Sequence, residues 1–176
     1  MTTSFPDEPV GGFPPPPRTV TDKQGREIDL YEAGAGEIDA LFEMYLAFDP
    51  KDRAQGIPPT GEEAIREWLE LLEAANSLHV VAAHDGDIVG HVMLVGDGEG
   101  SYELAIFVLQ PYQGAHIGTE LVRTGLGLGE ARGIERVWLS VERWNDAAVA
   151  LYEKIGFETT SSASFEMEMA LRLDRL

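Results

Sequence analysis

The apolar positions of this chain change their spacing several times, and each change predicts a new element. Residues 26–33 form the first predicted strand. From Gly36 onward, apolar side chains recur at the i, i+3, i+4 and i+7 spacing of one helical face, which predicts a first helix. Its apolar positions are Ile38, Leu41, Phe42, Tyr45 and Leu46.

A second helix is predicted from Thr60 to about Ala75. Thr60-Gly-Glu-Glu63 has the form of a capping box, in which the threonine side chain caps the helix and Glu63 reaches back. The apolar positions that follow have helical spacing: Ile65, Trp68, Leu69 and Leu72. Residues 49–59 contain several prolines and charges, so we expect them to form a loop between the two helices.

Strands follow the second helix. Residues 78–83 and 87–95 flank Asp85-Gly86, a dipeptide typical of tight hairpins. Residues 96–100 predict another turn, before an apolar strand over 103–109. Near the C-terminus, Phe165, Met167, Met169 and Leu171 alternate with less apolar residues, which indicates a strand with one wet face.

Residues 102–132 predict a strand, a glycine-bearing turn and an amphipathic helix over 119–132. The first N–H groups of a helix lack intrahelical partners, and the helix dipole adds positive potential there, so this end favours phosphate. Gly114 and Gly118 leave room for a ligand to approach the backbone. The turn lacks the glycine-lysine phosphate loop and the three-glycine dinucleotide fingerprint, which argues against ATPase and Rossmann functions.

The next segment predicts a second strand–helix unit. Val137, Leu139 and Val141 alternate within a strand over 135–142. Asn145 can cap a helix that runs to about Ile155, and glycine at position 156 suits its C-terminal end.

At this point the sequence resembles the GNAT acetyltransferase superfamily. Gln113-Gly-Ala-His-Ile-Gly118 is similar to the acyl-CoA loop, and Asn145…Ala148…Leu151-Tyr152…Gly156-Phe157 is similar to a second motif of the family. The resemblance implies an α/β fold, a single domain with a mixed, mostly antiparallel sheet flanked by about four helices. We expect this N-acetyltransferase domain over 26–176, preceded by a proline-rich flexible or peripheral arm over 1–25.

The resemblance also implies acetyl-CoA as co-substrate. The loop N–H groups would bind its pyrophosphate, and the end of the 103–109 strand would pair with its pantetheine, with the N–H of Val108 polarising the thioester carbonyl. The implied cofactor-binding residues are Phe107, Val108, Leu109, Gln113, Gly114, Ala115, His116, Ile117, Gly118, Thr119 and Asn145.

Two catalytic roles follow from the same resemblance. Tyr152 would be the acid that protonates the departing thiolate, and Glu103 is the candidate base, directly or through water. The acceptor would be the primary amine of a small molecule, peptide or protein, attacked in a ternary complex. The alternative is a non-catalytic acyl-CoA sensor or interaction module on the same fold, and a homodimer is compatible with either.

One position departs from the family pattern. His116 stands where the family loop has its middle glycine. A position with φ > 0 would make histidine costly, whereas a position in the first helical turn would not. We expect the first-turn position, with the N–H of His116 still directed at phosphate.

Composition narrows the function further. The net charge of −18 argues against a nucleic-acid partner, whose phosphates would be repelled. The absence of cysteine excludes disulfides, thiolate metal sites and a cysteine nucleophile. The four histidines lack metal-ligand spacing, and we expect no metal. Without a visible signal peptide or membrane span, the expected location is cytoplasmic. The acidity is diffuse, and only three of the 13 basic residues are lysines, which suggests adaptation to a concentrated-salt cytoplasm; an acidic surface that attracts a cationic substrate is the competing explanation.

Overall fold

A computed structural model describes residues 4–53, 57–162 and 165–174. Residues 1–3 of the predicted arm, residues 54–56 of the predicted loop and residues 163–164 and 175–176 of the predicted domain lie outside this description. The strands are β1 Arg18–Thr21, β2 Glu27–Glu32, β3 Ser77–His84, β4 Asp87–Gly96, β5 Ser101–Val108, β6 Arg136–Glu142, β7 Glu158–Ser162 and β8 Glu166–Arg172. The helices are α1 Ile38–Leu46, α2 Glu62–Ala74, α3 Ile117–Ala131 and α4 Asp146–Ile155, with short 3-10 turns η1 Ala35–Glu37, η2 Pro50–Asp52 and η3 Gln110–Tyr112.

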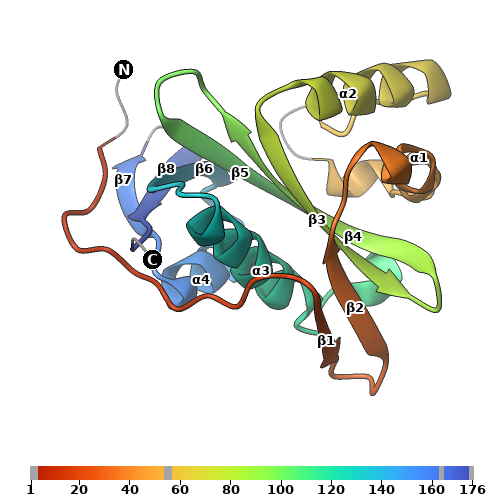
Figure 1. Cartoon of the computed structure of the whole chain (residues 1–176), viewed down its shortest axis with the longest axis horizontal. Helices are drawn as coiled ribbons and strands as arrows, with labels where there is room; N and C mark the ends of the chain where they lie inside the picture. Colours follow the sequence, from red (N-terminus) through yellow and green to blue (C-terminus); the bar gives the residue numbers. More distant parts are fainter. Residues whose placement is uncertain (1–3, 54–56, 163–164, 175–176) are drawn as a thin grey trace.

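The strands form one twisted sheet in the order β1-β2-β3-β4-β5-β6-β8-β7. Neighbouring strands are antiparallel except β5 and β6, which are parallel. Helices α1 and α2 cover one face of the sheet, and α3 and α4 cover the other (Figure 1). Two apolar cores result, one on each face. The predicted mixed, mostly antiparallel fold with four helices is confirmed.

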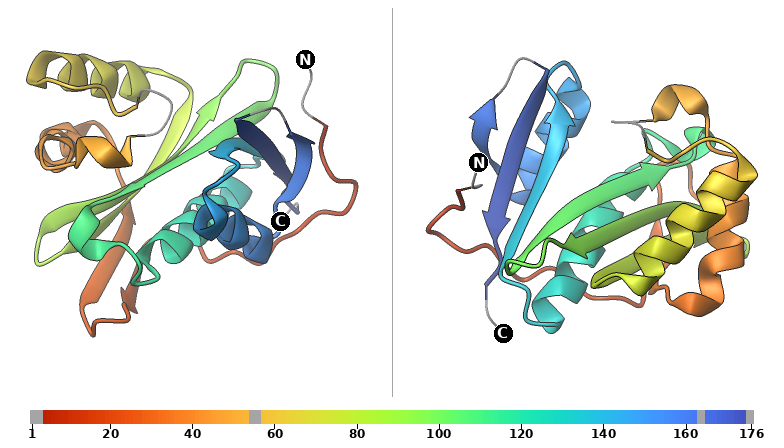
Figure 2. Two further views of the ribbon diagram at one scale, coloured as in Figure 1. Left: turned by 180° about the vertical axis from the view of Figure 1, so that it is seen from behind. Right: turned by 90° about the horizontal axis from the view of Figure 1, so that it is seen from above.

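Strands β5 and β6 pair only at their first residues. Ser101, Tyr102 and Glu103 are opposite Arg136, Val137 and Trp138, and beyond these residues the two strands diverge into a V (Figure 2, right). Because the strands separate, one edge of β5 pairs with no strand of the described residues over its last positions. This opening in the sheet is the feature that positions the site.

Strand β1 was not predicted. It lies within the proline-rich segment and pairs antiparallel with β2. Farther upstream, the N–H of Val10 donates to the carbonyl of Arg172 at 2.8 Å. Pro14 crosses α3 at Gly127, where an added Cβ would lie 2.5 Å from the Pro14 carbonyl atoms. The segment therefore lies against the domain through a contact that only glycine permits. The division of the chain at residue 25 stays a prediction.

The predicted capping box at Thr60 is wrong. Helix α2 begins at Glu62, and its N-cap is Gly61, which has φ 95° and no side-chain cap. This positive φ turns the chain into the helix one residue later than predicted, so the Thr60 side chain makes no capping bond to the first turn. By contrast, the side chain of Asn145 accepts a hydrogen bond from the N–H of Ala148 at 3.2 Å, which confirms the predicted cap of α4.

Candidate functional site

The opening between β5 and β6 leads into a cleft of about 730 Å³. Its walls come from the end of β5, the η3–α3 loop, the first turn of α3, and α4. The lining residues are Lys23, Phe48, Asp52, Ile106, Phe107, Val108, Tyr112, Gln113, Gly114, His116, Gly118, Thr119, Asn145, Ala147, Ala148, Ala150, Leu151, Tyr152 and Lys154. Segments far apart in the sequence therefore converge on the N-terminus of α3.

His116 is the N-cap of α3 and has φ 72° and ψ 5°, the left-handed conformation. The expectation that it lies in the first helical turn is wrong. The chain must reverse here to start the helix, and Gly114, two residues earlier, also has a positive φ of 71°. Histidine thus occupies a conformation that costs a side-chain-bearing residue free energy, and the loop retains it.

Basic side chains gather around this helix end. A second cavity of about 570 Å³ adjoins the cleft, and the two share Lys23, His116, Thr119 and Lys154. Two of the three lysines in a chain of net charge −18 therefore lie at the N-terminus of α3. The helix dipole and the unpartnered N–H groups act in the same direction, so this end attracts anions.

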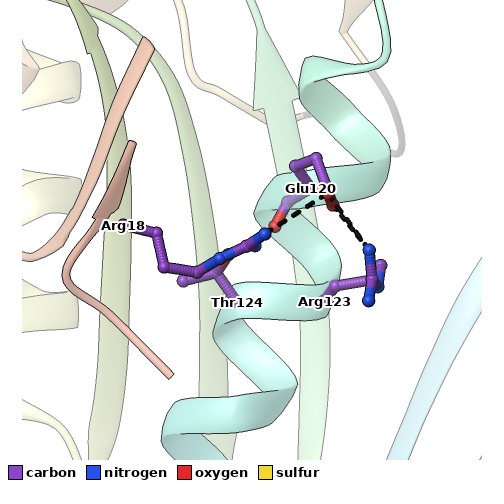
Figure 3. A network of polar contacts seen from close by, with 4 residues as sticks. All are labelled: Arg18, Glu120, Arg123 and Thr124. Carbon is purple, nitrogen blue, oxygen red and sulfur yellow. Dashed lines mark hydrogen bonds and ion pairs between the residues drawn. The ribbon is translucent and has the colours of Figure 1, made fainter. Parts of the chain in front are cut away.

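A carboxylate in the first turn of α3 is neutralised locally. Arg123 Nη1 donates to both oxygens of Glu120 at 3.1 and 3.0 Å, and Arg18 Nη2 lies 3.5 Å from Oε1 (Figure 3). Arg18 Nη1 also donates to Thr124 Oγ1 at 2.9 Å, which ties β1 to α3. Held between two guanidinium groups, Glu120 offsets little of the positive potential at the helix end.

The turn between β1 and β2 clamps the loop that precedes α3. The N–H of Lys23 donates to the carbonyl of Ala115 at 3.2 Å, and Arg26 Nη1 donates to that of Pro111 at 3.2 Å. The Arg26 guanidinium also lies 4.1 Å from the ring centre of Tyr112, a cation–π contact. The loop conformation is thus supported by a distant segment of the chain.

The free edge of β5 presents backbone groups to the cleft. The N–H of Leu109 donates to the carbonyl of Val89, so alternation along an antiparallel ladder directs the N–H of Val108 away from β4. The Val108 carbonyl faces the same way, because it accepts from Gln113 Nε2 at 3.0 Å. A second bond from that nitrogen to Asp52 Oδ2, at 3.1 Å, ties the loop to the α1–α2 connection.

Tyr152 lies on α4 and faces the cleft. It is only 8% exposed, and burial raises the pKa of its phenol to about 12. Its ring packs edge-on against Phe157, with centroids 5.7 Å apart. Among the described residues its hydroxyl has no hydrogen-bond partner, so it can donate to a group bound in the cleft.

Comparison with known proteins agrees with this geometry. The family described as "Acetyltransferase (GNAT) family" matches residues 38–157. The chain belongs to the GNAT acetyltransferase family. The predicted family membership is confirmed, and the V between β5 and β6 and the α3 loop can be described as parts of a GNAT domain.

Two relatives and one solved structure are also similar to this chain. The uncharacterized N-acetyltransferase Rv2669 of Mycobacterium tuberculosis is 33% identical over 101 residues, which are 57% of this chain and 65% of that protein. This chain therefore spans just under two thirds of that relative. An N-alpha-acetyltransferase of Sulfurisphaera tokodaii is 30% identical over 152 residues, 77% of this chain and 83% of that one. The yncA structure from Salmonella typhimurium, which holds its cofactor acetyl-CoA, superposes with a TM-score of 0.69 at 18% identity, over 85% of this chain and 95% of that one.

Most residues predicted to bind the cofactor meet in the GNAT cleft. Phe107, Val108, Gln113, Gly114, His116, Gly118, Thr119 and Asn145 line it, as does Tyr152, the residue predicted to be the catalytic acid. Leu109, Ala115 and Ile117 do not; the side chains of the last two are buried, with 1% exposure each, so only their backbone can serve a ligand. The assignment of these residues to cofactor binding stays a prediction.

Glu103 lies apart from the cleft, at the closed end of the V. It is the last β5 residue opposite β6, five positions before Val108, which is about 17 Å along a strand. Burial raises the pKa of Glu103, and the carboxylates of Glu168 and Glu166 add to the rise. Its role as base stays a prediction, and at this separation it needs water to carry the proton.

Sequence reasoning missed Lys23, Lys154 and Asp52. Each comes from a segment outside the two GNAT motifs or from a motif position with no prescribed residue. The scarcity of lysine was the available signal, because two of the three lysines line the cleft.

Among the described residues, the helices are too short or too polar for any of them to span a lipid bilayer.

Proposed function

We propose that this protein transfers an acetyl group from acetyl-CoA to a primary amine. One observation carries the proposal: the α3 N-terminus, the free edge of β5 and Tyr152 of α4 all line one cleft. The GNAT membership supports the same reaction class.

The cleft offers different chemical groups to different parts of the cofactor. The N–H groups of 114–119 and the ammonium groups of Lys23 and Lys154 suit phosphate groups, whereas the N–H of Gln113 already donates to the carbonyl of Gln110. The outward N–H and carbonyl of Val108 suit the amides of a pantetheine arm, which extends the sheet by one strand-like segment. Asn145, which caps α4, lines the same path.

Acetyl transfer then requires the protein to stabilise negative charge, to protonate the departing sulfur and to accept the proton of the amine. The N–H of Val108 stabilises the developing negative charge on the carbonyl oxygen, an interaction that can contribute about 3 kcal/mol. The amine nitrogen attacks the carbonyl carbon, the carbon–sulfur bond breaks, and Tyr152 gives its phenolic proton to the departing sulfur. The proton that the amine loses passes through water to Glu103.

A direct attack in a ternary complex fits the sequence, because the chain has no cysteine that could carry the acetyl group. Carboxylates support an amine as the acceptor. Glu103, Glu166 and Glu168 lie on one face of the sheet, by the strand registers, and the pKa of Glu103 is raised by burial and, to a smaller extent, by the charges of the other two carboxylates. A protonated amine approaching this face would be attracted before it is deprotonated.

Calorimetry tests the cofactor site. Acetyl-CoA titrated into the protein in molar KCl should bind with micromolar affinity. The double variant Lys23→Gln/Lys154→Gln should lose about tenfold in affinity, whereas Lys51→Gln, at the third lysine and outside the cleft, should bind as the wild type does. Equal losses in both would show that net charge, and not this site, governs the interaction.

Release of CoA in the presence of amines tests the transfer. The panel should begin with a peptide α-amine, because one relative is named an N-alpha-acetyltransferase, and continue with lysine side chains and polyamines. Binding of acetyl-CoA without CoA release from any amine would favour a non-catalytic acyl-CoA sensor. Absence of binding by the folded protein would remove both functions.

A further inference from the structure

Four polar side chains form a continuous hydrogen-bonded chain on the face of the sheet covered by α1 and α2. The Tyr45 hydroxyl lies 2.6 Å from His91 Nδ1, and His91 Nε2 lies 2.8 Å from His79 Nδ1. His79 Nε2 lies 2.9 Å from Ser77 Oγ, which donates to the carbonyl of Leu72 at 2.6 Å. His91 is fully buried and Tyr45 is 2% exposed.

The Leu72 carbonyl fixes the direction of every proton in this chain, because a carbonyl can only accept. Ser77 must therefore donate to Leu72 and accept from His79 Nε2–H. A neutral His79 then has a bare Nδ1, which accepts from His91 Nε2–H. The bare Nδ1 of His91 accepts in turn from the Tyr45 hydroxyl. Both imidazoles are thus the Nε2–H tautomer.

One end of the chain reaches the cofactor cleft. The Tyr45 ring packs edge-on against Phe107, with centroids 5.6 Å apart, and at 6.1 Å from Phe48. Phe48 and Phe107 both line the cleft. The position of the Tyr45 ring, which its hydroxyl bond to His91 fixes, therefore sets two walls of the site.

The other end of the chain reaches a separate cavity of about 210 Å³, on which His79 and His91 border. The charged groups that face it are Glu73 on α2, Glu32 on β2 and Arg132 at the end of α3. Arg132 donates to both oxygens of Glu32, at 2.6 and 2.9 Å, and Glu73 is the charged side chain that raises the pKa of His79.

We propose that Tyr45, His91 and His79 are positioning residues for the cofactor cleft. Protonation of His79 removes the hydrogen bond that holds the Tyr45 ring in place. An imidazolium at His79 must donate from Nδ1, so His91 must accept at Nε2 and carry its proton on Nδ1. His91 then donates to the Tyr45 oxygen, and the Tyr45 hydroxyl hydrogen loses its acceptor among apolar rings. The ring shifts to recover a partner, and Phe48 and Phe107 shift with it.

The pKa directions place this change on the acid side of neutrality. Burial lowers the pKa of His79, against smaller opposing effects of the Leu72 carbonyl and Glu73. Burial and the neighbouring His79 lower the pKa of His91 strongly. A histidine whose native pKa is lowered contributes to the stability of the ordered state when the pH is above its ordinary pKa of about 6.5. That contribution is lost as the pH falls through the lower native pKa.

Nitrogen-15 NMR of the imidazoles tests the proton order on the wild-type protein without any ligand. At pH 7.5 both His79 and His91 should give the Nε2–H pattern. On acidification His79 should become doubly protonated, and His91 should change to the Nδ1–H tautomer in the same transition. An Nδ1–H tautomer at either residue at pH 7.5, or a His91 tautomer that stays unchanged when His79 titrates, would overturn the proposed relay.

Calorimetric binding of acetyl-CoA tests the positioning role, which rests on the proposed function. Between pH 7.5 and 5.5 the wild type should lose about tenfold more affinity than His79→Gln, which keeps a donor and an acceptor but does not titrate. Tyr45→Phe should bind more weakly than the wild type at pH 7.5 and show the smaller pH dependence of His79→Gln.

The two failures can be told apart. A wild type that binds no acetyl-CoA at pH 7.5 rejects the proposed function and the positioning role with it. Binding at pH 7.5 with parallel pH curves for the wild type and His79→Gln rejects the positioning role alone.

Discussion

The left-handed backbone at His116 gives a sharp test of the loop. Its φ of 72° places a Cβ-bearing residue in a region that costs about 1–2 kcal/mol, whereas glycine adopts it freely. His116→Gly should remove this cost. The greater freedom of glycine in the unfolded chain returns about 0.5–1 kcal/mol of it. We therefore expect the free energy of unfolding to rise by about 0.5–1 kcal/mol.

Two control variants separate the backbone from the imidazole. His116→Ala keeps the Cβ and so should be no more stable than the wild type. Gly114→Ala places a new Cβ at φ 71°, where it would meet no atom of the described residues within 4 Å, so its cost of about 1 kcal/mol should come from the backbone alone.

Urea unfolding at fixed salt, followed by circular dichroism, measures all four proteins. Thermal unfolding should agree, with a midpoint about 1–4 °C higher for His116→Gly in a chain of this length. Equal stabilities for His116→Gly and His116→Ala, or a loss in both, would mean that the histidine side chain supports the loop and that the strain argument is mistaken.

Three further predictions concern the two residues proposed to be catalytic and the net charge of the chain. Tyr152→Phe should lower kcat at least tenfold with little change in KM, because it removes the proton donor and keeps the ring; an unchanged kcat would exclude Tyr152 as the acid. Glu103→Gln should unfold at a higher urea concentration than the wild type at pH 7–8, and this gain in stability should fade towards pH 4. The reason is that a carboxyl with a raised native pKa loses its contribution to stability as the pH rises. A gain in stability that is independent of pH would contradict this reason. Stability at net charge −18 should increase from dilute buffer to molar KCl, and a protein equally stable in both would count against salt adaptation.

The order of elements could be predicted from the sequence because the signals are local. The apolar spacing of Ile38, Leu41 and Tyr45 specifies one helical face, and Asn145 and Gly156 mark the two ends of α4 with residues suited to those positions. The two GNAT motifs brought most cleft residues together for the same reason, since each is a continuous strand–turn–helix segment.

Contacts between distant segments were decided only by the tertiary structure. Strand β1 has a weak signal of its own and exists because it pairs with β2, while Arg18 is held by α3. The backbone at His116 is left-handed because the chain must reverse between β5 and α3, which no local propensity of histidine indicates.

The histidines show the difference most clearly. The sequence predicted His79 and His91 as strand residues, and that is confirmed. Their contact depends on the register of β3 against β4, and their connection to Tyr45 depends on the packing of α1 over that face. Periodicity fixes which face of an element is buried, but the partner of a buried polar group is set by the assembled fold, because its hydrogen bond must come from whichever segment packs against it.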